Sequence, residues 1–234
     1  MADILEARTI IWAIIGGLLP ALFWLWFWLR EDAEHPEPKF LVALTFILGM
    51  ITVVIVVPIQ RYFSLFITDE KSVIIILSTI EELAKFAIAY VSILRSRVIN
   101  EPIDYAIYMV TIGLGFAALE NILYLIHPIA GNDTVVGLLT GHLRYLGSTL
   151  LHAITSSLIG ISLGLSFGLK QNIRFLYCLI GIGASITLHS IFNFFIMKDN
   201  GTQFIQVFGF LWVVTIISIL LFEKLRRMSH DLAQ

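Results

Sequence analysis

STIEELAKFAIAY, residues 78–90, lies in the middle of a run that is otherwise free of charge from Val73 to Leu94. A run of this length can cross a bilayer as one helix, at about 1.5 Å of rise per residue over roughly 30 Å of hydrocarbon. Two carboxylates and one ammonium group interrupt it, those of Glu81, Glu82 and Lys85. Charged groups are costly inside a membrane, so we expect them to mark a functional site and to find partners on other helices.

The composition of the whole chain is that of a membrane protein. Of its 234 residues, 58% are hydrophobic and 14% are charged, whereas soluble domains carry about 25% charged residues. The hydrophobic residues fall in seven blocks of membrane-spanning length, Ile10–Leu29, Phe40–Ile59, Val73–Leu94, Tyr105–Ile126, Tyr145–Leu169, Phe175–Met197 and Phe204–Phe222. Because helices satisfy their own backbone in lipid, we predict an all-α, polytopic transmembrane helical bundle of about seven spans, forming one integral membrane domain over residues 1–234.

The positions of Lys and Arg predict the direction of the chain, since cytoplasmic loops are enriched in both. If the N-terminus is outside, four of the basic residues in loops and ends lie on the outer side and nine lie on the cytoplasmic side. The nine are Arg30, Lys39, Arg95, Arg97, Lys170, Arg174, Lys224, Arg226 and Arg227. We therefore expect an N-out, C-in orientation. The charged segment 61–71 is too short to span and could be an interfacial helix. A net charge of −2 gives no reason to expect a nucleic-acid partner.

Four spans carry an ionisable or coordinating side chain at nearly the same depth. Glu81, Glu120, His152 and His189 each lie six to eight residues inside the predicted outer end of their span, which is about 9–12 Å below the outer surface. His189 and Asn193 share one helix face. His152 belongs to a stripe of small residues at intervals of four, Ser148, Ser156, Gly160, Gly164 and Gly168. Such stripes let helices approach closely, so His152 should point into the bundle.

Simpler explanations exist for each of these residues taken alone. Glu81 and Lys85 could form an ion pair within their own helix, which would make their burial tolerable. Glu120 and His152 could form a structural hydrogen bond, and His189 could be an interhelical donor. Their common depth favours a shared functional site instead.

The residue types in this layer suit hydrolysis by an activated water. No serine or cysteine sits beside a base in a G-x-S-x-G setting, so nucleophilic catalysis has no support. A glutamate could deprotonate water, with His189 and Asn193 stabilising an oxyanion. Glu120, His152 and His189 could equally form the two-histidine, one-glutamate ligand set of a catalytic zinc, with another glutamate as base. Both routes lead to water attack on an acyl carbon, most simply that of a peptide bond.

Four segments resemble the PrsW-type intramembrane proteases, which are distantly similar to the membrane CAAX-prenyl and bacteriocin-processing proteases. They are EELAK (81–85), FAALEN (116–121), HAITSS from His152, and HSIFN (189–193). By that resemblance Glu81 and Glu82 match the paired catalytic glutamates, Glu120 the FxxxEN glutamate, His152 and His189 the two intramembrane histidines, and Asn193 the oxyanion asparagine of the CAAX-type relatives. Those relatives have histidine where this chain has Glu120, which leaves open whether Glu120 is a ligand, a base or a group that tunes the pKa of a neighbour.

The resemblance implies an integral protease of a bacterial-type plasma membrane. Its partner would be a membrane-anchored single-span protein, such as an anti-sigma factor, cut in or near the transmembrane segment, and zinc is the one cofactor it suggests. Two other functions are consistent with buried glutamate and histidine: a proton- or ion-coupled transporter, and an inactive scaffold that binds a partner helix. The sequence has no repeated halves of the kind common in transporters, and the EExxK, FxxxEN and HxxxN motifs are intact, which favours the protease.

Overall fold

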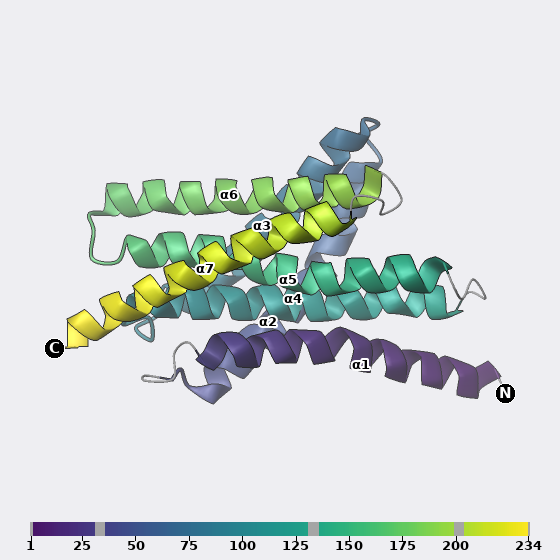
Figure 1. The fold of residues 1–234 in the computed structure, drawn as a ribbon, viewed down its shortest axis with the longest axis horizontal. Coiled ribbons are helices and arrows are strands. Elements are labelled where there is room, and N and C mark those ends of the chain that lie inside the picture. The colour runs from purple at the N-terminus through teal and green to yellow at the C-terminus, as the bar shows by residue number, and fades with distance from the viewer. Residues whose placement is uncertain (1, 31–35, 131–135, 199–203, 234) are drawn as a thin grey trace.

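The computed structural model describes residues 2–30, 36–130, 136–198 and 204–233. All regular secondary structure in these ranges is helical, so the predicted all-α class is confirmed (Figure 1). The helices are α1 Ala2–Leu29, α2 Lys39–Ser64, α3 Glu70–Ala89, α4 Pro102–Ala130, α5 Val136–Leu165, α6 Gln171–Lys198 and α7 Phe204–Ala233, and a short π-helix, η2 Tyr90–Leu94, continues α3.

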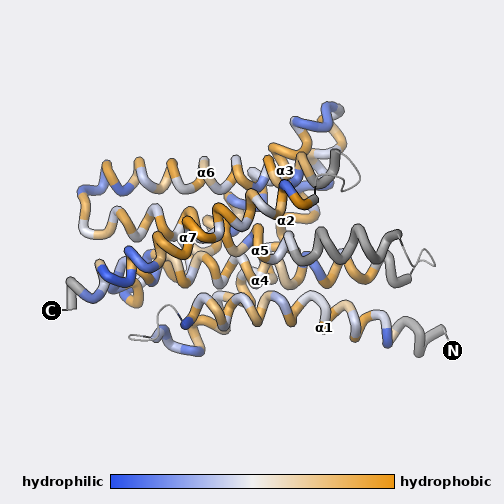
Figure 2. Tube along the Cα trace, in the orientation of Figure 1, coloured by the Kyte–Doolittle hydropathy of each residue, from blue (hydrophilic) through white to orange (hydrophobic). Residues whose placement is uncertain are grey.

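Six of the seven long helices have the length and composition to cross a membrane. Figure 2 shows that the coloured parts of these helices are mainly apolar in their middle. The exception is α3, because it carries the charged residues of the EELAK segment in addition to Glu70 and Lys71. The two termini lie at opposite ends of the bundle (Figure 1). The chain is thus an integral membrane protein, and its N-out, C-in orientation stays a prediction.

The connection between α2 and α3 differs from the sequence expectation. Residues 61–64 form the end of α2 and residues 70–71 begin α3, so the expectation of a separate interfacial helix at 61–71 is wrong. The physical reason is that α2 continues through Pro58, and α3 has a strong start of its own. Asp69 accepts hydrogen bonds from Ser72 Oγ at 2.7 Å and from Ser72 N at 2.8 Å, which cap the helix. These two bonds lower the pKa of the Asp69 carboxyl.

Helices α4 and α5 form the centre of the bundle. In their most apolar segments 67% and 78% of the residues are buried, against 17–39% in the other four helices that can span a membrane. Glycines bring the two backbones together: a Cβ on Gly113 would lie 2.6 Å from the His152 carbonyl oxygen, and one on Gly160 would lie 2.5 Å from the Tyr105 carbonyl oxygen. The predicted close approach is therefore confirmed at Gly160, and the contact at Gly113 fixes His152 against α4. Gly168 of the predicted stripe lies beyond the end of α5.

The main hydrophobic core lies between α4 and α5 and the helices α1 and α7. Its largest fully buried members include Trp28, Ile107, Ile154 and Phe222, and the rings of Trp28 and Phe222 are 4.5 Å apart between centroids. A second cluster around Tyr108 and neighbouring residues packs against α3 and η2. Because these apolar contacts hold α4 and α5 on several sides, the polar side chains of both helices can face α3 and α6 at one level.

Candidate active site

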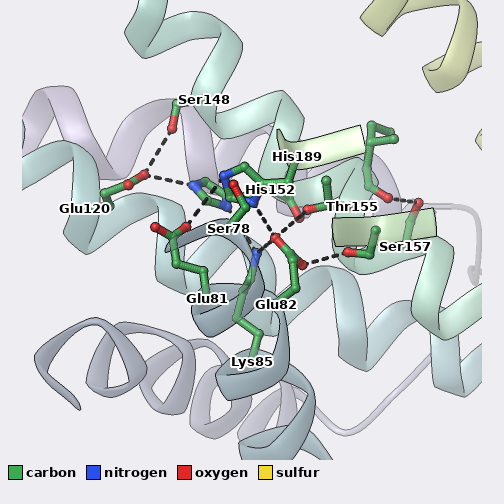
Figure 3. A network of polar contacts seen from close by, with 12 residues as sticks. Ser78, Glu81, Glu82, Lys85, Glu120, Ser148, His152, Thr155, Ser157 and His189 are labelled. Atoms are coloured by element: carbon green, nitrogen blue, oxygen red, sulfur yellow. Dashed lines mark hydrogen bonds and ion pairs between the residues drawn. The ribbon is translucent and has the colours of Figure 1, made fainter. Parts of the chain in front are cut away.

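A buried polar network lies where α3, α4, α5 and α6 meet (Figure 3). Five of its members are at most 7% exposed, whereas the Glu120 side chain is 34% exposed. The network contains Glu81, Glu82 and Lys85 of α3, Glu120 of α4, His152 of α5 and His189 of α6. The structure therefore brings together five of the six residues predicted for catalysis, and only Asn193 lies beside the network.

Glu82 is the most heavily hydrogen-bonded member. Its Oε1 accepts from Lys85 Nζ at 2.6 Å, from His189 Nδ1 at 2.6 Å and from Thr155 Oγ1 at 3.2 Å. Its Oε2 accepts from Ser185 Oγ at 2.7 Å. A fully buried carboxylate is stable only when it is paired and hydrogen-bonded in this way. Glu82 thus joins three helices, and four donors occupy its two oxygens.

Lys85 pairs with Glu82, so the alternative of an ion pair between Glu81 and Lys85 is wrong. The reason is that the Glu81 carboxylate turns toward α2 and α6, away from Lys85. Lys85 Nζ also lies 3.1 Å from His152 Nδ1. An ammonium group can only donate, so Nδ1 accepts and the His152 proton is on Nε2. From there it is donated to Glu120 Oε2 over 2.8 Å.

Glu81 has one satisfied oxygen and one without a hydrogen bond. Oε1 accepts from Gln60 Nε2 of α2 at 2.7 Å. Oε2 is buried and makes no hydrogen bond, although it lies 3.6 Å from His189 Nε2. If the His189 ring is neutral, its donation to Glu82 through Nδ1 leaves a lone pair at Nε2. In that state two acceptor atoms face each other, an arrangement that suits a shared proton or a bound cation.

Glu81, His152 and His189 each offer one metal-ligating atom, and these atoms lie within 4.8 Å of one another. Tetrahedral zinc with bonds of about 2.0–2.1 Å separates its ligands by roughly 3.4 Å, close to the 3.6 Å between Glu81 Oε2 and His189 Nε2. The hydrogen bond from His189 Nδ1 to Glu82 is the kind of outer contact that orients metal-binding histidines. This donor set fits zinc.

The cluster differs in one carboxylate from the set predicted from the sequence, which was Glu120, His152 and His189. Glu120 accepts from His152 and, at 3.2 Å, from Ser148 Oγ. Both ring nitrogens of His152 are hydrogen-bonded, one to Lys85 and one to Glu120. If His152 binds a metal, one of these two hydrogen bonds must therefore be replaced by a bond to the metal.

Asn193 lies one turn beyond His189 on α6 and is half-buried. Its Nδ2 donates to Ser78 Oγ of α3 at 3.5 Å. Ser78 precedes Glu81 and Glu82 by about one helical turn, so Asn193 borders the network on the side of the α2–α3 connection. The carboxamide is thus near the carboxylates and available as a donor at the edge of the site.

The sequence pattern did not identify Gln60 as a member of the site. Its predicted span ended at Ile59, which placed Gln60 outside the membrane, whereas α2 continues to Ser64. The sequence did contain one indication of this role: Gln60 is an uncharged amide directly after the apolar run that ends at Ile59. Ser148 belonged to the stripe interpreted as a packing surface, and it proves to donate to Glu120; Ser185 of α6 likewise donates to Glu82.

Comparison with known proteins adds an independent line of support. The family model described as PrsW family intramembrane metalloprotease matches residues 37–221, which include every residue of the network. Protease PrsW of Bacillus subtilis (strain 168) is 28% identical over 209 residues, covering 85% of this chain and 90% of the relative. Protease PrsW of Shouchella clausii is 23% identical over 219 residues, covering 92% and 98%. No solved structure matches.

Proposed function

The chain belongs to the PrsW family of intramembrane metalloproteases, and we propose that it is an endopeptidase that cuts a membrane-anchored protein in or near its transmembrane segment by glutamate-activated, zinc-assisted water attack. The observation that carries this proposal is the Glu81 Oε2 atom. It is buried without a hydrogen-bond donor and lies 3.6 Å from the Nε2 atom of His189. A buried carboxylate oxygen without a donor is costly unless it serves a bound group.

Glu81, His152 and His189 are the residues that would hold the zinc ion. A bound zinc lowers the pKa of a coordinated water and polarises the carbonyl of the substrate. Glu82 and Lys85 act as positioning residues in this proposal. Glu82 fixes the His189 ring through Nδ1, and Lys85 neutralises Glu82 and holds the His152 ring. Both are fully buried, which suits a supporting role rather than contact with substrate.

Glu120 is the proposed general base. Its side chain is 34% exposed, the most open of the three glutamates, which suits a group that must meet water and substrate. Ser148 orients its carboxylate. The hydrogen bond from His152 Nε2 to Glu120 is the one that zinc binding would displace, because Lys85 holds Nδ1. Glu120 would take a proton from the attacking water while the water oxygen bonds to the peptide carbon. It would then return that proton to the amide nitrogen as the carbon–nitrogen bond breaks.

Asn193 is the proposed oxyanion donor. Its carboxamide borders the network and already acts as a donor toward Ser78. A donor that meets the negative charge only as it develops on the peptide oxygen stabilises the transition state more than the substrate. This role agrees with the position of the asparagine in the HxxxN motif.

The substrate we propose is a single-span protein of the plasma membrane, of the anti-sigma-factor type. With the N-terminus outside, the site lies below the extracytoplasmic surface, where the end of a substrate helix can unwind and expose its carbonyl groups. A protease at this depth would release the outer part of its substrate. The EExxK, FxxxEN and HxxxN motifs all lie on helices that contribute to this site.

The decisive experiment uses the purified full chain in detergent with candidate single-span substrates. Glu81→Gln, Glu120→Gln and His189→Ala should each abolish cleavage while the melting temperature stays near that of the native protein. Metal analysis separates the roles: Glu81→Gln and His189→Ala should lose zinc, and Glu120→Gln should retain it. Chelation should inactivate the native protein and added zinc should restore it.

Other results would overturn parts of the proposal. Full cleavage by all three variants would remove the site. Zinc loss from Glu120→Gln with retention in Glu81→Gln would exchange the roles of the two glutamates. Undiminished cleavage after complete metal removal would replace the zinc-assisted route with glutamate catalysis alone. A Glu81-dependent proton flux in liposomes without proteolysis would support transport instead.

A further inference from the structure

A second site is suggested by a cavity of about 660 Å³ between η2, α4 and the start of α6. Tyr105 of α4 and Arg174 and Cys178 of α6 line it. His189 follows Cys178 by eleven residues on the same helix, a distance of about 16 Å along the axis. The cavity is therefore separate from the catalytic network.

Two guanidinium groups give this cavity a positive charge. Arg95 and Arg174 both line it, and none of the described residues in its wall is acidic. Arg174 donates to Tyr105 Oη at 2.7 Å and lies 5.9 Å from the centre of that ring. Arg95 lies 5.5 Å from the centre of the Tyr90 ring. Each guanidinium has five N–H donors and matches the geometry of a phosphate.

The remainder of the wall is mainly apolar, with contributions from Phe86, Leu94, Ile99, Leu163, Leu169 and Phe175. The cavity also lies at the end of the membrane-spanning segments, because the apolar span of α6 begins at Gln171 and that of α4 begins at Pro102. A cavity with two arginines and an apolar wall at the end of the membrane-spanning segments matches an amphipathic ligand with an anionic head group.

The π-helix supplies part of this wall. Tyr90 and Leu94 are the first and last residues of η2, and Arg95 follows directly. π-helical turns are rare and are found mostly at functional sites, because they widen a helix locally and redirect its side chains. Here the widened turn places an aromatic ring and a guanidinium in the same wall.

We propose that this cavity binds one anionic phospholipid, with the phosphate between Arg95 and Arg174 and the upper part of the acyl chains against the apolar wall. Both arginines lie on the predicted cytoplasmic side, together with Arg97 and Lys170. The cytoplasmic leaflet is rich in anionic lipid, which basic residues at the surface attract. A volume of about 660 Å³ accommodates a headgroup and part of the chains.

The only cysteine of the chain offers a native reporter, because Cys178 lines the cavity and is partly exposed. In delipidated full-length protein in detergent, phosphatidylglycerol should slow the reaction of Cys178 with a maleimide. Phosphatidylcholine and inorganic phosphate should not. The Arg95→Gln/Arg174→Gln variant should need at least about tenfold more phosphatidylglycerol for the same protection, since it loses two charge-assisted contacts.

The matched control is Arg97→Gln/Lys170→Gln, which removes two exposed charges that do not line the cavity and should leave protection unchanged. Native mass spectrometry of the native protein, with phosphatidylglycerol and phosphatidylcholine both present, tests whether the anionic lipid is preferred. This measurement does not depend on the folding of any variant. Equal retention of both lipids would overturn the proposal, and so would unchanged protection in the Arg95→Gln/Arg174→Gln variant. If inorganic phosphate alone protects Cys178, the ligand of the cavity is a free anion and not a lipid.

Discussion

His189 links the two adjacent glutamates of α3 through opposite sides of its ring. Its Nδ1 donates to Glu82 Oε1 over 2.6 Å, and its Nε2 lies 3.6 Å from Glu81 Oε2. Glu82 is surrounded by donors, whereas Glu81 keeps one oxygen without a hydrogen bond. Neighbouring carboxylates in one motif thus occupy different environments, and we expect their substitution to have different consequences.

Glu82→Gln should destabilise the fold as well as abolish cleavage. The substitution leaves the ammonium of Lys85 fully buried without its counter-charge, and breaking a buried pair in this way costs about 3–5 kcal/mol. Thermal unfolding in detergent measures the stability, and substrate cleavage measures the activity. Glu81→Gln is the matched control on the next residue: it should lose cleavage with little change in melting temperature. Equal melting temperatures for the two variants would refute the structural role of Glu82.

The pairing of Glu82 with Lys85 predicts a coupling between their substitutions. Lys85→Met alone should also be destabilising, because it leaves the buried Glu82 carboxylate uncompensated. The double variant Glu82→Gln/Lys85→Met removes both charges, so its loss of stability should be smaller than the sum of the single losses by at least about 1 kcal/mol. Unfolding of all four proteins by denaturant gives this coupling energy. Strict additivity would show that the two side chains do not stabilise each other.

The sequence was sufficient to predict which helices build the site, because depth and helix face follow from residue counting. We predict one level for Glu81, Glu120, His152 and His189 because each is six to eight residues from the predicted outer end of its span. The inward orientation of His152 followed from the small-residue stripe, and the close contact of α4 with α5 at Gly113 bears it out.

Partner choice within the site could not be predicted from spacing. Glu81 and Glu82 precede Lys85 by four and three residues, and both distances allow an ion pair on a helix. The pairing with Glu82 depends on donors from other helices, Thr155, Ser185 and His189, which only the packed structure brings together. The proposed division of roles between Glu81 as zinc ligand and Glu120 as base likewise depends on the tertiary structure.

Gln60→Leu should reduce cleavage without preventing folding. Gln60 donates to Glu81 Oε1 at 2.7 Å, so its removal frees the one anchored oxygen of a proposed zinc ligand. Loss of such an outer contact lowers activity or metal affinity by about 10–100-fold. The measurements are kcat/KM on a single-span substrate and zinc content at limiting zinc concentrations.

Ser64→Ala is the control for this substitution. Ser64 lies one turn beyond Gln60 on α2, is exposed, and donates only to the Gln60 carbonyl oxygen. It should retain native activity. Native kcat/KM and zinc affinity in Gln60→Leu would show that Glu81 needs no support from α2.

Gly113→Ala should displace His152 and so impair both stability and cleavage. The added Cβ would lie 2.6 Å from the His152 carbonyl oxygen and 2.4 Å from Ser156 Oγ. The first contact is with backbone, so α5 itself must move, at a cost of about 1–3 kcal/mol for overpacking. Gly183→Ala on α6 is the matched control because its Cβ would meet nothing within 4 Å. That variant should be as stable as the native protein or more so, since alanine is a better helix former by about 1 kcal/mol. Melting temperature and cleavage rate, measured for both variants, distinguish them. Native activity in Gly113→Ala would mean that the α4–α5 contact does not control the position of His152.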